Sequence, residues 1–224
     1  MIPIRDEIPT RRVPIVNYLL IAANVLVFIL MWLVGSAQES VVYQFAMIPA
    51  NYQDGVDLGD VADLFISMFM HAGLAHIGGN MLYLWIFGDN VEDQLGSGRY
   101  LIFYLVGGLI ASFTHLLTNP GSQIPTVGAS GAIASVLGAY LVLFPYSRIV
   151  TAIAFGFFIR LTMIPAVIVL GLWFVLQLFS GVLSMGGPDV GGVAFWAHAG
   201  GFVAGVVMAK LLGSGAGQER AVPW

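Results

Sequence analysis

Long apolar runs separated by short polar connections dominate the pattern of this 224-residue chain. A helix needs about 20 apolar residues to cross a hydrocarbon core of about 30 Å. Runs that reach or approach this length predict membrane-spanning helices over residues 15–34, 76–94, 100–117, 130–144, 162–183 and 194–212. The segment 149–159 is apolar but too short to span, so we expect it at the membrane interface or re-entering the bilayer.

The first apolar run could instead belong to a signal peptide, because Gly35-Ser36-Ala37 resembles a cleavage site. Its apolar part is nearer 20 residues than the roughly 7–15 of a signal peptide, which favours a retained helix. Residues 36–72 form a polar-to-amphipathic connection. The chain therefore divides into an N-terminal segment (1–14), a membrane domain (15–212) and a tail (213–224).

Composition agrees with a membrane protein. Hydrophobic residues make up 58% of the chain and charged residues 9%, whereas soluble domains carry about 25% charged residues. The absence of cysteine excludes disulfides and thiolate metal sites. The basic residues are scattered without forming a patch, so nucleic acid is not an expected partner.

The distribution of charge tests the predicted number of spans. With six spans, the N-terminus, the second and fourth connections and the C-terminus hold every basic residue, namely Arg5, Arg11, Arg12, Arg99, Arg148, Arg160, Lys210 and Arg220. The first and fifth connections carry only acidic charges. Because basic loops stay cytoplasmic, the chain is predicted to be an all-α polytopic bundle of six transmembrane helices with both termini cytoplasmic.

Polar side chains inside three predicted spans need an explanation, because ionisable groups in a bilayer cost several kcal/mol. His76 and Asn80 open the second span and share a helix face. Ser130 opens the fourth span and His198 lies in the sixth. A single interfacial serine is usually a packing residue. The occurrence of all four polar residues at the outer ends of neighbouring helices instead indicates a catalytic site.

Small residues predict where these helices touch. They recur every four residues as Ser130, Ala134 and Gly138 in the fourth span and as Ala197, Gly201, Gly205 and Ala209 in the sixth. Such ladders let helix backbones approach closely in lipid. A close approach is what a serine and a histidine on separate helices need in order to hydrogen-bond.

These residue types fit acyl transfer. Ser130 is a nucleophile once His198 takes its proton. The Asn80 amide, a His76 ring N–H and the Ser130 backbone N–H could stabilise the oxyanion. No acidic residue is placed to orient His198, so we expect a dyad rather than a triad. We expect no cofactor and no metal.

The chain resembles the rhomboid intramembrane serine proteases over about residues 15–212. The resemblance rests on four motifs in the family's order, namely His76-x-x-x-Asn80, Gly88-x-x-x-Glu92-x-x-x-Gly96, Gly128-Ala129-Ser130-Gly131 and Ala197-His198-x-x-Gly201-x-x-x-Gly205. It implies Ser130 as nucleophile, His198 as base and His76 and Asn80 as oxyanion donors. Gly128, Gly131, Gly201 and Gly205 would support the site, and Glu92 would hold the cytoplasmic helix end by hydrogen bonds.

The resemblance also implies partners and location. Substrates would be single-span membrane proteins, cut in or near the outer part of the transmembrane segment. The protein would lie in the lipid bilayer, which we expect to be a bacterial inner membrane. The Gly-rich connection 185–193 would be a flexible cap over the site. The fifth span, with Trp173 and Phe174, would be a side gate.

Two positions depart from the family pattern. Ala62-Asp63 stands where many relatives have a Trp-Arg pair, and Ala134 stands where many have a tyrosine that stacks on the catalytic histidine. The first difference bears on how the first loop meets the membrane. The second leaves the residue that orients His198 unidentified. Neither removes a reacting group.

Three other functions compete with a serine protease. A metal-dependent hydrolase or metal transporter could use His71, His76 and His198, but zinc proteases normally show His-Glu-x-x-His, which the sequence lacks. A non-enzymatic relative that binds transmembrane helices would usually lack the serine or the histidine. A transporter would show broken helices in two similar halves. The motifs favour the protease.

Overall fold

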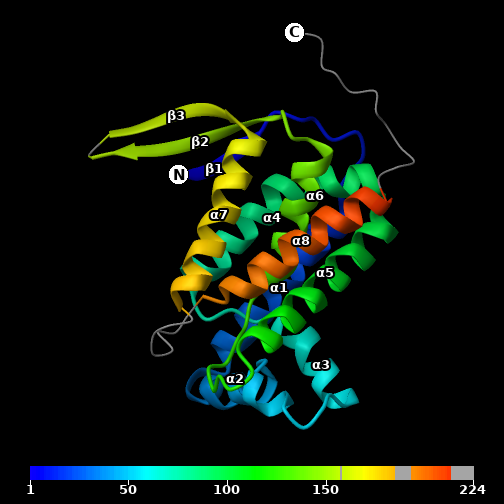
Figure 1. Ribbon diagram of the computed structural model, residues 1–224, viewed down its shortest axis with the longest axis vertical. Helices are drawn as coiled ribbons and strands as arrows, with labels where there is room; N and C mark the ends of the chain where they lie inside the picture. The colour runs from blue at the N-terminus through cyan, green and yellow to red at the C-terminus, as the bar shows by residue number, and fades with distance from the viewer. Residues whose placement is uncertain (157, 185–192, 213–224) are drawn as a thin grey trace.

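A bundle of long helices carries a small β-sheet at one end and short helices at the other (Figure 1). The structure is a computed structural model that describes residues 1–156, 158–184 and 193–212. The long helices are α1 (Ile15–Leu33), α4 (Leu74–Leu95), α5 (Ser97–Thr118), α6 (Ser130–Leu143), α7 (Ala166–Ser184) and α8 (Phe195–Leu212). Helices α2 (Gln38–Phe45) and α3 (Leu58–Ser67) occupy the connection after α1.

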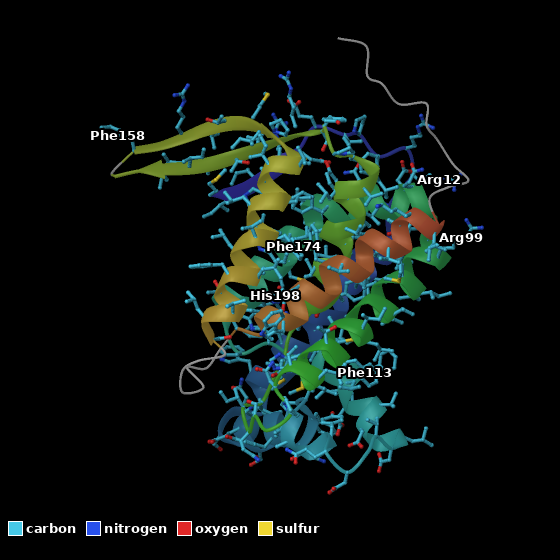
Figure 2. The ribbon with its side chains drawn as sticks, in the orientation of Figure 1. Arg12, Arg99, Phe113, Phe158, Phe174 and His198 are labelled. Atoms are coloured by element: carbon cyan, nitrogen blue, oxygen red, sulfur yellow. The ribbon has the colours of Figure 1, made fainter. Side chains whose placement is uncertain are left out.

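The helices indicate an integral membrane protein. Among the described residues, α1, α5, α7 and α8 are long and apolar enough to cross a membrane. Helix α6 is apolar but has only 14 residues, and α4 carries Asp89, Glu92 and Asp93 in its last two turns. The six spans and the cytoplasmic termini therefore stay predictions. Arg12 and Arg99 do lie at the end of the bundle that carries the sheet (Figure 2).

The expectation of an all-α fold is wrong for two segments. Strands β1 (Ile2–Asp6), β2 (Arg148–Phe155) and β3 (Phe158–Pro165) form an antiparallel sheet in the order β1-β2-β3. The segment expected at the interface is thus part of a β-hairpin, rich in the β-branched residues that favour strands. Gly156, with a φ of +58°, provides the left-handed conformation at its turn.

The hairpin also corrects one predicted boundary. The fifth span was expected from residue 162, but residues 162–165 complete β3 and α7 begins after Pro165, which cannot donate a backbone hydrogen bond. Strand β1, within the segment 1–14 ahead of the first span, pairs with β2 of this hairpin. The Asp6 carboxylate accepts hydrogen bonds from Tyr140 on α6 (2.6 Å) and Asn90 on α4 (2.8 Å).

Helix α6 forms the centre of the bundle. All its side chains from Gly131 to Tyr140 are buried, with α4, α5 and α8 packed around it. A helix that is apolar on every face is expected in such a position. Ser130, its first residue, is only partly buried and lies at the end of α6 away from the sheet.

Candidate active site

Ser130 and His198 are in direct contact, although they are 68 positions apart in the sequence. The Nε2 atom of His198, in the first turn of α8, lies 2.8 Å from the Oγ atom of Ser130, the first residue of α6. His198 is buried, whereas Ser130 is partly exposed. The pair can therefore pass a proton from the hydroxyl to the imidazole while the hydroxyl stays accessible from the cavity described below.

Glycines bring the two helices close enough for this contact. A methyl group at Gly201 would collide with the carbonyl oxygen of Gly131, and one at Gly205 with that of Ser135. A methyl group at Gly138 would meet the backbone of Phe202. The ladder on α8 thus lies at the contact as predicted. The α6 atoms nearest to it belong to Gly131 and Ser135, one residue later than the predicted Ser130 and Ala134.

The loop before Ser130 is held by backbone hydrogen bonds to the first connection. The Gly128 N–H donates to the carbonyl of Ser67 (2.9 Å), and Thr126 exchanges two hydrogen bonds with Met47. Gly128 has a φ of +132°, which an L side chain rarely adopts. A methyl group there would also lie 2.8 Å from His76 Nε2. Glycine is therefore required both by the turn and by the neighbouring imidazole.

Helix α4 places two side chains with hydrogen-bond donors, Asn80 and His76, near Gly128 in the loop before Ser130. The Nδ2 atom of Asn80 is buried and has no hydrogen-bond partner among the residues that the structure describes. His76 Nδ1 lies 3.5 Å from the backbone N–H of Ala72, a long contact that favours a proton on Nε2, the atom facing Gly128. Unpaired buried donors are rare, and a site that binds a developing negative charge gives such donors a use.

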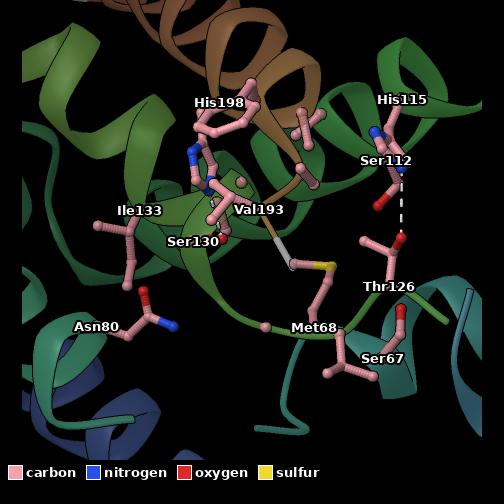
Figure 3. Close-up of a pocket in the computed structure, with 18 of the residues that line it drawn as sticks. Ser67, Met68, Asn80, Ser112, His115, Thr126, Ser130, Ile133, Val193 and His198 are labelled. Carbon is pink, nitrogen blue, oxygen red and sulfur yellow. Dashed lines mark hydrogen bonds between the residues drawn. The ribbon is translucent and has the colours of Figure 1, made fainter. Parts of the chain in front are cut away.

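A cavity of about 720 Å³ joins these groups. Its walls include Ser130, His198, His76 and Asn80, and Figure 3 shows Asn80 and Ser130 on neighbouring parts of the lining. This volume lies within the range of about 300–1,000 Å³ that is usual for ligand sites. The four predicted catalytic and oxyanion residues thus border one space that could hold an extended piece of peptide.

Sequence reasoning missed a polar contact to His198. Gln177 of α7 places its Oε1 atom 2.8 Å from His198 Nδ1. The ring of Trp173, one turn earlier on α7, lies 5.8 Å from the imidazole at an interplanar angle of 35°. The signal was available, because Gln177 interrupts an apolar predicted span and polar residues in spans are usually functional. Its partner on another helix could not be inferred.

His71 lies in the loop before α4 and contacts His76 edge-on, with ring centroids 5.0 Å apart. Burial, with a smaller contribution from His76, lowers the pKa of His71 to about 4. Its Nδ1 atom pairs with the carbonyl of Phe69 (3.3 Å). His71 is therefore neutral at pH 7, and its ring packs against that of His76. Within the described residues, no group of three or more His, Asp or Glu side chains is arranged to hold a metal ion.

Glu92 lies far from the dyad, at the end of α4 near the sheet. Its carboxylate accepts hydrogen bonds from the backbone N–H groups of Val16 (3.1 Å) and Asn17 (2.7 Å), and from the hydroxyl of Ser97 (2.6 Å). Val16 and Asn17 open α1, so Glu92 caps the N-terminus of another helix. This matches the kind of role implied for it by resemblance.

Two further expectations concern the access to the site. Residues 185–192 of the expected cap lie outside the described residues, while Val193 lines the cavity. The expected gate, α7, packs on α8 through Phe174, whose ring stacks on Phe202 at 4.6 Å. Ala62 and Asp63, which replace the Trp-Arg pair of many relatives, lie in α3.

Comparison with known proteins supports a family assignment. Residues 58–215 match the family described as "Rhomboid domain". "Rhomboid protease GluP" of Bacillus subtilis (strain 168) is 34% identical over 128 residues. "Presenilin-associated rhomboid-like protein, mitochondrial" of Homo sapiens is 35% identical over 132 residues. "Putative rhomboid protease YdcA" of Bacillus subtilis (strain 168) is 31% identical over 131 residues.

These alignments cover different shares of the proteins compared. They take in 57% or 58% of this chain. They cover 24% of GluP, 33% of the human protein and 63% of YdcA. The chain thus matches less than two thirds of each relative. Since these relatives include a mitochondrial protein, the expected bacterial inner membrane stays a prediction.

Proposed function

Because this chain belongs to the rhomboid family, we propose that it is an intramembrane serine endopeptidase. The observation that carries the proposal is the 2.8 Å contact between His198 Nε2 and Ser130 Oγ at the wall of the cavity. Substrates of the proposed enzyme are single-span membrane proteins, cut within or near the outer part of the span.

The proposed reaction uses Ser130 as nucleophile. Its oxygen attacks the carbonyl carbon of the scissile peptide bond while His198 takes the hydroxyl proton. The tetrahedral intermediate then collapses, the C–N bond breaks, and His198 gives the proton to the leaving amine. Water, activated by the same imidazole, hydrolyses the acyl-enzyme and regenerates the hydroxyl. No cofactor takes part in these steps.

Asn80 and His76 are the proposed oxyanion donors, together with the backbone N–H of Ser130. Support comes from the buried Asn80 Nδ2, which lacks a partner in the described part of the chain, and from the His76 Nε2 that faces Gly128. A preorganised donor that meets its acceptor only when charge develops lowers the barrier without strengthening substrate binding. With no partner among the described residues, the Asn80 amide is available for this role.

The proposed topology has six spans, with the β-sheet and both termini on the cytoplasmic side and the dyad nearer the outer surface. The absence of native cysteines makes this testable, because each introduced thiol is unique. Ser40 on α2 and Tyr146 before β2 are exposed at opposite ends of the bundle. A membrane-impermeant maleimide added outside intact cells should label Ser40→Cys and spare Tyr146→Cys. The reverse pattern would contradict the topology.

The decisive experiment reconstitutes the full chain in liposomes with a panel of single-span substrates. Wild type should cleave at least one of them, and Ser130→Ala and His198→Ala should each abolish cleavage. Thermal unfolding should show that both variants fold. Cleavage that survives in Ser130→Ala would refute the serine mechanism, and loss of wild-type cleavage on adding a chelator would favour a metal-dependent enzyme. Binding of transmembrane helices without cleavage would indicate a non-enzymatic relative.

A further inference from the structure

Gln177 is a polar residue in the middle of an apolar helix. Its neighbours Leu176 and Leu178 are apolar, and the exposed face of α7 is formed by large aliphatic and aromatic side chains. An amide in such a helix costs free energy unless it finds a hydrogen-bond partner. The Gln177 side chain is half-buried and turns inward, and its partner is the imidazole of His198, at 2.8 Å.

With the Gln177 amide oriented as in this structure, the contact places the proton of His198 on Nδ1. The Oε1 atom of Gln177 can only accept, so the Nδ1 atom of His198 must donate. In a neutral imidazole the Nε2 atom then bears the lone pair, and that lone pair faces the hydroxyl of Ser130. A base must be in this tautomer to remove the serine proton. If the amide were turned so that its NH₂ faced Nδ1, the proton would lie on Nε2 and the dyad could not react.

We propose that Gln177 is a positioning residue of the active site, which holds His198 in the reactive tautomer and orientation. The inference extends the proposed Ser130–His198 mechanism and rests on it. An amide serves the same purpose in the Cys-His-Asn arrangement of papain-like proteases. The sequence did not identify the residue that orients His198, since Ala134 offers no aromatic ring to the imidazole. Gln177 takes this role.

Helix α7 contacts His198 at two points one turn apart. Gln177 bonds to the edge of the imidazole, and Trp173 lies obliquely beside its ring. Both residues are on the inner face of α7. The orientation of the base is therefore tied to the position of α7 against α8. A displacement of α7 that separates Gln177 from His198 would leave Ser130 without a correctly oriented base.

Two substitutions and a control test the inference. Gln177→Leu keeps a side chain of similar size but removes the acceptor. Gln177→Glu supplies a carboxylate that can accept the same Nδ1 proton. Leu176→Ala is the control, because Leu176 is on the same helix and 51% exposed. All three should be compared with wild type and Ser130→Ala in the same liposomes, with thermal unfolding as the measure of folding.

For Gln177→Leu we expect kcat to fall about 10²-fold with KM nearly unchanged. A wrong tautomer costs about 10⁴ in the serine protease triad, and we expect less here because a neutral amide adds no charge. Labelling of Ser130 by a fluorophosphonate should slow by a similar factor. Gln177→Glu should recover most of the lost rate, and Leu176→Ala should match wild type. A purely packing role for Gln177 would not give rescue by glutamate.

The tautomer can also be measured directly. With ¹⁵N-labelled histidine, His198 is the resonance missing from His198→Ala among the four histidines. Wild type should show a protonated Nδ1 and an unprotonated Nε2, and Gln177→Leu should show a mixture or the reverse. The inference would be overturned if Gln177→Leu had the same kcat, labelling rate and His198 tautomer as wild type. That result would leave the proposed function intact. An inactive wild type, or an active Ser130→Ala, would overturn the proposed function itself.

Discussion

Gly201 of α8 lies directly against the carbonyl oxygen of Gly131 on α6, one residue after Ser130. No side chain fits between the two backbones at this level. Since His198 is one turn before Gly201 on the same face of α8, this contact sets the distance across which the imidazole must reach. The contact between His198 and Ser130 therefore depends on glycine at position 201.

Gly201→Ala should therefore weaken both stability and catalysis. The added methyl group must push α8 away from α6, and overpacking of this kind typically costs about 1–3 kcal/mol. A misplacement of about 1 Å can cost about 10²-fold in rate. We expect a lower unfolding temperature and a kcat at least tenfold below wild type. Gly171→Ala on α7, where a methyl group meets no described atom within 4 Å, is the matched control and should lower neither quantity.

Asn80→Ala should separate catalysis from stability. If the Asn80 amide donates only to the transition state, kcat should fall about 10²–10³-fold while KM stays near the wild-type value. Because this buried donor has no partner within the described ranges, its removal should not lower the unfolding temperature. Steady-state kinetics and thermal unfolding on one preparation would check both points. A destabilised protein with wild-type kcat would instead assign Asn80 to packing.

The helices and the chemical residues could be predicted because both follow from local rules. An apolar run of sufficient length indicates a span, and a spacing of four residues places His76 and Asn80 on one face. Apart from the small-residue ladders, which predicted the contact of α6 with α8, contacts between distant segments follow no such rule. The pairing of β1 with β2 joins residues 2–6 to residues 149–152, and Gln177 meets a histidine on another helix. The sequence showed that Gln177 is a polar residue in an apolar span, but it did not indicate that its hydrogen-bond partner is His198.

Glu92→Ala should destabilise the protein without changing the chemistry. Glu92 is buried and accepts three hydrogen bonds, so its removal leaves two backbone N–H groups of α1 and the hydroxyl of Ser97 unpaired. We expect a loss of about 2–4 kcal/mol, read as a lower unfolding temperature, with kcat retained below that temperature. The control is Asp93→Asn, because the hydrogen bond that Asp93 accepts from the backbone N–H of Arg12 is exposed. Equal effects of the two variants would contradict the capping role.

Asp6 should make stability depend on pH. Burial raises the pKa of Asp6 to about 6 from its ordinary 3.8, although the hydrogen bond from Tyr140 opposes the shift. Since the folded state holds the proton more tightly, the stabilisation is complete below about pH 3.8 and is lost as the pH rises through about 6. Because Asp6 is partly exposed, this loss amounts to about 1–2 kcal/mol.

Replacing the carboxyl by an amide removes this titration. Asp6→Asn keeps an oxygen that can accept from Tyr140 and Asn90, but carries no charge at any pH. Its unfolding temperature in detergent should therefore fall less than that of wild type between pH 4 and pH 6, and should exceed wild type at pH 7. Parallel profiles for the two proteins across this window would mean that Asp6 is not the group responsible.

Fixing α7 against α8 should distinguish substrate entry from chemistry. The stacked rings of Phe174 and Phe202 identify two positions that face each other across these helices. Cysteines at both positions, in a chain with no others, can be joined by a short bifunctional thiol reagent. If α7 is the side gate, cross-linking should slow cleavage of a transmembrane substrate at least tenfold. Labelling of Ser130 by a small fluorophosphonate should persist, because the clamp keeps Gln177 beside His198.

The uncross-linked double variant controls for the lost ring stacking and should cleave faster than its clamped form. Each outcome has a structural meaning. Equal cleavage before and after cross-linking would exclude α7 as the route of entry. Loss of fluorophosphonate labelling together with cleavage would mean that the clamp itself distorts the dyad, so that the position of α7 controls the base and not only the passage of substrate.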